Sequence, residues 1–248
     1  MLIEKSKRHN FVFILSILLN LFFILSCFYL INKKGGMSWI KNKIAVATNK
    51  PVTQKYSNYY LTKESIFKTL DGKNQFVFLG DSITNHENWN ELFNNNNIVN
   101  RGIDSDTTDG VLNRLNTIIK SQPQKLFLMI GINDLGNGRN STYIINNYEK
   151  IISQVRKKSP NTIIYIQSIL PVNEQMINSK TISNKEILQT NEKLKQLVND
   201  KIVFINLFDL FLSKDNQLDK NYTFDGEHPN GTAYLIWKQA IERYVNSQ

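Results

Sequence analysis

Cysteine and histidine are scarce in this chain of 248 residues. The single cysteine, Cys27, excludes a disulfide within the chain and any cysteine-rich metal site. The three histidines, His9, His86 and His228, are scattered, and no cluster of carboxylates has the spacing of metal ligands. The chain also has no internal repeat. We therefore expect no bound metal and no cofactor.

Charge is absent from one long apolar run. Residues 11–31 carry no charged side chain over 21 positions. As a helix rising roughly 1.5 Å per residue, this run would cross a hydrocarbon core of about 30 Å. It is too long for a cleavable signal peptide, and no small-x-small site follows it. We expect residues 1–10 to be a cytoplasmic tail and residues 11–31 to be a transmembrane helix that acts as a signal anchor.

One alternative for this anchor is open at Cys27. The preceding residues Ile-Leu-Ser resemble a bacterial lipoprotein processing site, in which Cys27 would become the lipidated amino terminus. However, the apolar run continues after Cys27, where lipoproteins usually turn polar. Lysines flank the run on both sides and do not decide its orientation. Because a first span usually acts as an export signal, we expect a single-pass protein of the cell membrane with its domain outside the cell.

The basic excess of the chain surrounds the apolar run. Residues 1–50 contain eight Lys or Arg and one Glu, and the remaining 22 basic and 20 acidic residues leave residues 51–248 close to neutral. Lysines beside a membrane explain the formal charge of +9 better than contacts with phosphates do. We therefore expect a membrane as partner and no nucleic acid.

Strand and helix patterns alternate in the rest of the chain. After a stalk over residues 32–58, a globular domain is expected over residues 59–248. Apolar, β-prone runs predict five strands, over residues 76–79, 98–100, 125–130, 162–167 and 202–206. Helical spacing predicts helices over residues 62–70, with Thr62 as N-cap, and over 107–121, 143–157, 185–199 and 233–245. This alternation is typical of an α/β fold, a parallel sheet covered by helices on both faces.

A serine follows the first predicted strand. Ser82 stands two residues beyond the glycine-terminated run 76–79, at the carboxyl edge of the predicted sheet, where open α/β sheets bind ligands. Most Gly-Asp-Ser triplets are ordinary turns. Ser82 can therefore be a nucleophile only if a base and oxyanion donors converge on it.

Later loops offer these partners. His228 is the natural base, because imidazole titrates near working pH, and Asp225, three residues earlier, can orient the ring. The oxyanion would accept hydrogen bonds from the backbone N–H groups of Ser82 and Gly102 and from the side-chain amide of Asn133. Each residue also has an ordinary interpretation, since Gly102 could be a turn glycine, Asn133 could cap a turn and His228 could begin a helix. We expect His86 to be a surface loop residue.

Four blocks in order resemble the bacterial SGNH/GDSL hydrolases over residues 59–248: Gly80-Asp81-Ser82, Asn100-Arg101-Gly102, Gly131-Ile132-Asn133-Asp134 and Asp225-x-x-His228. The stretches 100–103, 107–112 and 169–173 are similar to the branch of that family typified by platelet-activating-factor acetylhydrolase.

This resemblance implies a three-layer α/β/α sandwich with a five-stranded, flavodoxin-like parallel sheet, and an esterase with a Ser-His-Asp triad. It implies Ser82 as nucleophile, Asp225 and His228 as its triad partners, and Gly102 and Asn133 as oxyanion donors. Glu227 departs from the family, which more often has an apolar residue there, and would add a negative charge near His228.

The expected function is therefore a membrane-tethered serine esterase. It would remove short acyl groups, acetyl above all, from a carbohydrate or lipid of the cell envelope. One alternative is a carbohydrate O-acyltransferase that uses the same triad, which product analysis with a glycan present would distinguish. The other is a non-catalytic binding module, which would not be labelled at Ser82 by a fluorophosphonate.

Overall fold

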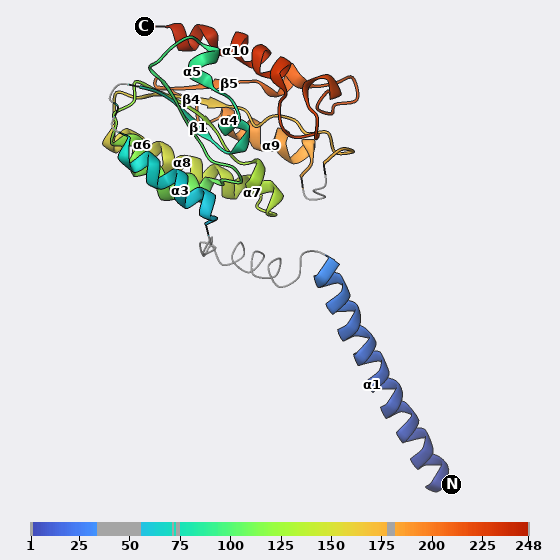
Figure 1. The fold of residues 1–248 in the computed structure, drawn as a ribbon. Coiled ribbons are helices and arrows are strands. Elements are labelled where there is room, and N and C mark those ends of the chain that lie inside the picture. The colour runs from blue at the N-terminus through green and yellow to red at the C-terminus, as the bar shows by residue number, and fades with distance from the viewer. Residues whose placement is uncertain (1, 34–55, 71, 73–74, 178–181, 248) are drawn as a thin grey trace. The chain divides into compact units, whose positions relative to one another are not determined.

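The computed structural model describes residues 2–33, 56–70, 72, 75–177 and 182–247 (Figure 1). The chain divides into two compact units, Met1–Val52 and Thr53–Gln248, and each is described by itself below. Most of the predicted stalk falls on residues 34–55, outside the described residues.

In the first unit, the described residues form the helix α1 (Leu2–Lys33). Its described side chains between Leu15 and Leu30 are mostly apolar and exposed. Within the described residues, no helix has the length and apolar character needed to cross a membrane. The span predicted over residues 11–31 includes residues 11–14 and 31, whose side chains lie outside the described part of the chain, so it stays a prediction.

The second unit is built on a five-stranded parallel sheet, which confirms the predicted sheet. The spatial order is β2-β1-β3-β4-β5. The strands are β1 (Phe76–Gly80), β2 (Ile98–Gly102), β3 (Lys125–Met129), β4 (Ile163–Gln167) and β5 (Ile202–Ile205). Strand β3 is buried along its whole length, as its unbroken apolar run after Lys125 requires of a strand covered on both faces.

Helices cover both faces of this sheet, so the unit has three layers. Figure 1 shows α5 and α10 over one face and α6, α8 and α9 over the other. The helices are α3 (Asn58–Thr69), α4 (Ser82–Asn85), α5 (Trp89–Leu92), α6 (Thr108–Ile119), α7 (Ile132–Gly136), α8 (Ser141–Lys158), α9 (Asn184–Lys195) and α10 (Gly231–Asn246), with 3₁₀ turns η1 (Phe208–Phe211) and η2 (Lys220–Tyr222).

The first predicted helix begins earlier than expected. Its N-cap is Ser57, whose Oγ accepts a hydrogen bond from the N–H of Tyr60 at 3.1 Å, and the predicted cap Thr62 lies inside α3. Tyr60 explains the difference. Its ring is buried against Ile103 and its hydroxyl donates to the Gly110 carbonyl at 2.8 Å, which anchors the first turn of α3 to the domain.

A row of aromatic rings crosses the sheet beneath α5 and α10. Phe78 and Phe127 are register partners on β1 and β3, and their ring centroids lie 4.7 Å apart. The row continues from Phe127 to Tyr165 on β4, also at 4.7 Å, and Phe78 stacks on Trp89 of α5 at 4.4 Å. Stacked, fully desolvated rings of this kind contribute about 0.5–1.5 kcal/mol per pair beyond their buried area. They pack β1, the strand that ends two residues before Ser82, against β3 and α5.

The strand order places a topological switch point at the carboxyl ends of β1 and β3. The chain leaves β1 toward β2 on one side and leaves β3 toward β4 on the other, so the two connections diverge. In open α/β sheets, ligands bind at such a switch point. Ser82 follows β1 and Asn133 follows β3, so both lie at this switch point.

Candidate active site

Ser82 is the first residue of the short helix α4. Strand β1 ends at Gly80, and Asp81 caps the helix by accepting a hydrogen bond from the N–H of Ile83 at 3.0 Å. As the first helical residue, Ser82 has an N–H group without an acceptor inside the helix. Its side chain is largely buried. The predicted turn is therefore a helix start that fixes the Ser82 hydroxyl and N–H together.

His228 and Asp225 meet Ser82 from the far end of the chain. Ser82 Oγ lies 2.9 Å from His228 Nε2, and His228 Nδ1 lies 2.7 Å from Asp225 Oδ2. The structure therefore brings together in one hydrogen-bonded row the three side chains that the sequence offered as nucleophile, base and orienting carboxylate.

A tight turn over residues 223–229 holds the Asp225 carboxylate. Its Oδ1 accepts hydrogen bonds from the N–H groups of Glu227 at 2.9 Å and His228 at 2.8 Å. Thr223 Oγ1 accepts from the N–H of Gly226 at 2.9 Å, and Gly226 has a φ of 88°, which favours glycine. The carboxylate is thus aimed at the imidazole by the backbone of the turn.

The charge state of Asp225 follows from these contacts. Partial burial acts to raise its pKa, but the N–H groups of His228 and Glu227 and the imidazole outweigh burial and lower the pKa to about 2. Asp225 is therefore ionised at neutral pH. Burial raises the pKa of neighbouring Glu227, although the imidazole of His228 opposes that rise.

The predicted oxyanion donors differ in their availability. Asn133 donates one amide hydrogen to the carbonyl of Asp106 at 3.0 Å, which leaves the other for a ligand. The N–H of Gly102 already donates to Asn100 Oδ1 at 2.7 Å. In the next loop, Ser105 adopts a left-handed φ of 60°, and its N–H has no acceptor among the described residues. The Gly102 assignment stays a prediction.

Gly102 has a second reason to be glycine. A Cβ built on it would lie 2.4 Å from the backbone N of Asn85 and 2.8 Å from the carbonyl O of Asp81. Helix α4 therefore packs directly on the end of β2, and this close approach sets the height of Ser82 above the sheet.

Buried acidic residues support the loops around the site. Asp106 pairs with Arg114 at 2.8 Å, both side chains being fully buried, and Arg114 also donates to the carbonyl of Gly80 at 3.1 Å. Burial raises the pKa of Asp106 to about 6 although Arg114 opposes the rise. Burial likewise raises the pKa of Asp134 to about 7, against the hydrogen bonds that it accepts from the hydroxyl and N–H of Thr108 at 2.6 and 2.9 Å.

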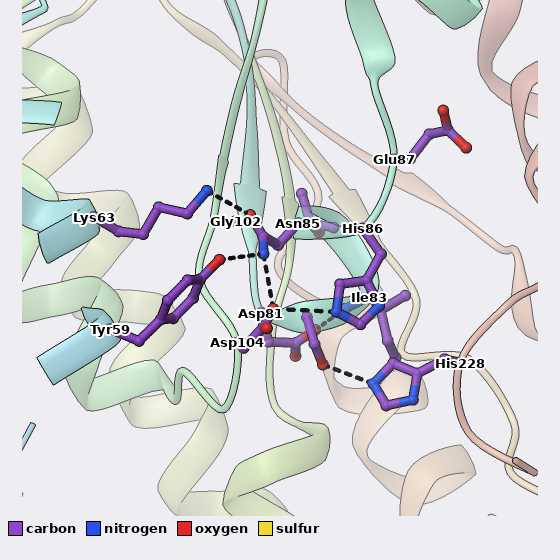
Figure 2. A network of polar contacts seen from close by, with 12 residues as sticks. Tyr59, Lys63, Asp81, Ile83, Asn85, His86, Glu87, Gly102, Asp104 and His228 are labelled. Atoms are coloured by element: carbon purple, nitrogen blue, oxygen red, sulfur yellow. Dashed lines mark hydrogen bonds and ion pairs between the residues drawn. The ribbon is translucent and has the colours of Figure 1, made fainter. Parts of the chain in front are cut away.

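Sequence reasoning missed the surroundings of His86. This side chain is exposed, as expected, but its ring centroid lies 5.1 Å from that of His228, and its Nε2 lies 3.3 Å from Asp104 Oδ1 (Figure 2). Ser82 and His86 are four residues apart, and the His86 N–H donates to the Ser82 carbonyl at 3.0 Å. An expected helix at Ser82 would have placed the two side chains on one face.

Metal ligands are not grouped in this region. Among the residues that the structure describes, no three His, Cys, Asp or Glu side chains lie together as they would around a metal ion. The expectations that the protein binds no metal and no cofactor stay predictions.

Comparison with known proteins fits this geometry. Residues 78–236 match the GDSL-like Lipase/Acylhydrolase family. The chain belongs to the GDSL-like lipase/acylhydrolase family. Like other members, it is a hydrolase that acts on acyl esters, which confirms the predicted class of enzyme.

Individual relatives of this GDSL-like hydrolase agree with the family. It is 26% identical over 176 residues to platelet-activating factor acetylhydrolase IB subunit alpha2 of Rattus norvegicus, covering 66% of this chain and 72% of that protein. A solved structure from Streptococcus pneumonia, named as a platelet activating factor, is 30% identical with a TM-score of 0.69, covering 75% of this chain and 92% of that one. A GDSL-like lipase from Bacteroides thetaiotaomicron, 23% identical with a TM-score of 0.65 over 75% and 96% of the two chains, shares the fold.

Proposed function

We propose that this acylhydrolase is a serine esterase that removes short acyl groups, acetyl above all, through Ser82, His228 and Asp225. The observation that carries the proposal is the row from Ser82 Oγ to His228 Nε2 at 2.9 Å and from His228 Nδ1 to Asp225 Oδ2 at 2.7 Å. A nucleophile, a base and an orienting anion in this order are what acyl transfer through serine requires.

The reaction proceeds in two steps. His228 Nε2 takes the Ser82 proton while Oγ attacks the ester carbonyl carbon, and the tetrahedral adduct then expels the alcohol, which receives that proton from His228. Water attacks the acyl-enzyme with His228 again as base, and the second adduct releases the carboxylic acid and restores the Ser82 hydroxyl. Ionised Asp225 stabilises the imidazolium in both steps.

The negative oxygen of each adduct needs donors that are already in place. The N–H of Ser82 and the free amide hydrogen of Asn133 supply two. The third is the N–H of Gly102, which would have to leave Asn100 Oδ1 to donate to the adduct.

Acetyl is the proposed acyl group because of the relatives. The rat protein is named an acetylhydrolase, and this chain spans 72% of its length. The proposed alcohol component is a carbohydrate or lipid of the cell envelope, because a protein attached to a membrane would lie close to such compounds.

Membrane attachment is part of the proposal. Its support is the uncharged run of residues 11–31 and the exposure of the apolar side chains between Leu15 and Leu30. We propose a single-pass anchor with the esterase unit outside the cell, or alternatively a lipid on Cys27. Fractionation of cells that express the full chain, with and without Cys27→Ala, tests both.

The esterase is tested with the purified full chain and an aryl acetate. Ser82→Ala should lower kcat by at least about 10³-fold and prevent labelling by a fluorophosphonate, because the variant lacks the hydroxyl that lies 2.9 Å from His228 Nε2. The matched control Ser65→Ala, in an exposed serine of α3, should behave as wild type. Retained hydrolysis in Ser82→Ala with an unchanged circular dichroism spectrum would end the proposal.

A further inference from the structure

A second imidazole and carboxylate lie beside the Ser82–His228–Asp225 row. The His86 ring is tilted by 31° to the His228 ring at a centroid distance of 5.1 Å, and its Nε2 faces Asp104 Oδ1 at 3.3 Å. The ester chemistry already described uses neither residue. Both side chains are open to solvent, His86 by 44% and Asp104 by 40%, so a substrate can reach them.

Three elements hold this pair in place. Asp104 Oδ1 accepts a hydrogen bond from Asn85 Nδ2 at 2.8 Å. Asn85 in turn donates to the Tyr59 hydroxyl at 2.8 Å and accepts from Lys63 Nζ at 3.1 Å. Figure 2 shows this network running from α3 through Asn85 and Asp104 to His86, with the His228 ring next to it. These bonds fix the Asp104 carboxylate that the His86 ring faces.

One nitrogen of the His86 ring remains open. With Nε2–H directed at Asp104, Nδ1 of the neutral ring is a hydrogen-bond acceptor, and it has no partner among the described residues. A group that binds there must bring a donor, and the hydroxyl groups of a polyhydroxy alcohol are neutral donors of this kind.

The position of His86 indicates which part of the ester it contacts, the alcohol component or the acyl group. In the proposed reaction, His228 hands its proton to the departing alcohol, so the alcohol oxygen lies at His228 Nε2. The His86 ring packs against the ring of that same residue. The alcohol component, rather than the acyl group, therefore passes beside His86.

We infer that His86 is a substrate-binding residue that accepts a hydrogen bond from a second hydroxyl of the alcohol component, which selects acyl esters of polyhydroxy compounds such as carbohydrates. This inference rests on the proposed esterase function. It distinguishes carbohydrate esters from esters of plain aliphatic alcohols, which offer no such hydroxyl.

The test uses two acetates of similar size, a monoacetylated methyl pyranoside and cyclohexyl acetate. Wild type should have the higher kcat/KM for the pyranoside. His86→Phe keeps a ring against His228 but has no nitrogen, and it should lower the ratio of the two kcat/KM values by about threefold to tenfold, the effect of one hydrogen bond. His86→Gln, which restores an acceptor, should recover part of the ratio.

The possible results separate the role of His86 from the esterase function. The control variant Asn90→Ala, at an exposed position of α5, should leave both values unchanged. A wild type without preference for the pyranoside, or a ratio that His86→Phe changes by less than twofold, overturns the role of His86 while aryl acetate hydrolysis keeps the esterase. A full chain that cleaves none of these esters overturns both.

Discussion

The two sides of the active site hold their carboxylates in opposite ways. On the open side, the turn 223–229, the Asp225 side chain is 55% exposed and its pKa falls to about 2. On the closed side, the buried pairs Asp106–Arg114 and Asp134–Thr108, burial raises the pKa of the two acids to about 6 and 7. The difference teaches that the charge used in catalysis is stabilised by N–H groups near water, whereas the loops are fixed by acids that water does not reach.

The substitution Asp225→Asn tests the open side, because it removes the charge of the carboxylate in the turn 223–229. The neutral amide cannot stabilise the imidazolium, so we expect kcat/KM for an aryl acetate to fall by about 10³–10⁴-fold. Thermal unfolding should change much less than activity, because the amide oxygen of Asn can still accept from the N–H groups of Glu227 and His228. The exposed Asp215→Asn is the control. An active Asp225→Asn variant would mean that another group orients His228.

The substitution Arg114→Met tests the closed side, because it removes the cation of the buried Asp106–Arg114 pair. This change leaves Asp106 buried without its cation, and we expect the free energy of unfolding to fall by about 3–5 kcal/mol in urea denaturation. Because Arg114 also donates to Gly80, two residues before Ser82, activity should fall as well. Adding Asp106→Asn removes the unpaired charge and should restore part of the stability. A double variant as unstable as Arg114→Met would show that packing, not charge, sets the cost.

The pH dependence of stability also distinguishes the buried carboxylates from the exposed one. The folded-state pKa of Asp134, about 7, lies above its unfolded value of about 4, so the folded state binds more protons between these values. Asp134 should therefore make stability fall as pH rises from 4 to 7, by at most about 1.4 kcal/mol per pH unit. Asp225 acts in the opposite sense, and its contribution is lost as pH falls from about 4 toward 2.

Asp134→Asn separates these effects. The pKa values of Asp81, Asp106 and Glu227 are also raised, so the slope of wild type between pH 6 and 7 is a sum of several groups, and the part that Asp134→Asn removes is the contribution of Asp134. Urea denaturation at half-unit intervals of pH measures it. Equal slopes in variant and wild type would show that Asp134 does not titrate in this range.

Much of the sheet could be predicted because its strands are short apolar runs that stop at turn residues. Every predicted strand lies within about two residues of an observed one, the usual uncertainty of strand ends. The helices α4, α5 and α7 were not predicted, because four or five residues are too few to show helical periodicity. The start of α3 was misplaced because contacts of Tyr60 with distant residues decide it.

The residues of the candidate site could likewise be predicted in part. Ser82, Asn133, Asp225 and His228 could be named because each follows a predicted strand or falls in a recognisable block. The contact of His86 with Asp104 and His228 could not, because it joins α4 to the loop after β2 and to a turn over a hundred residues later. The bond from Gly102 to Asn100 is equally invisible in sequence, since it depends on how the chain bends at the end of β2.

The turn 223–229 carries His228 and Asp225 together, three residues apart, whereas Ser82 is attached to the sheet. A displacement of those seven residues would move both groups away from Ser82 at once. The Ser82 hydroxyl would then have no base to accept its proton. The bonds that fix the turn, among them the one from the Asn173 N–H to the Gly226 carbonyl at 2.7 Å, therefore determine whether the Ser82 hydroxyl has a base at all.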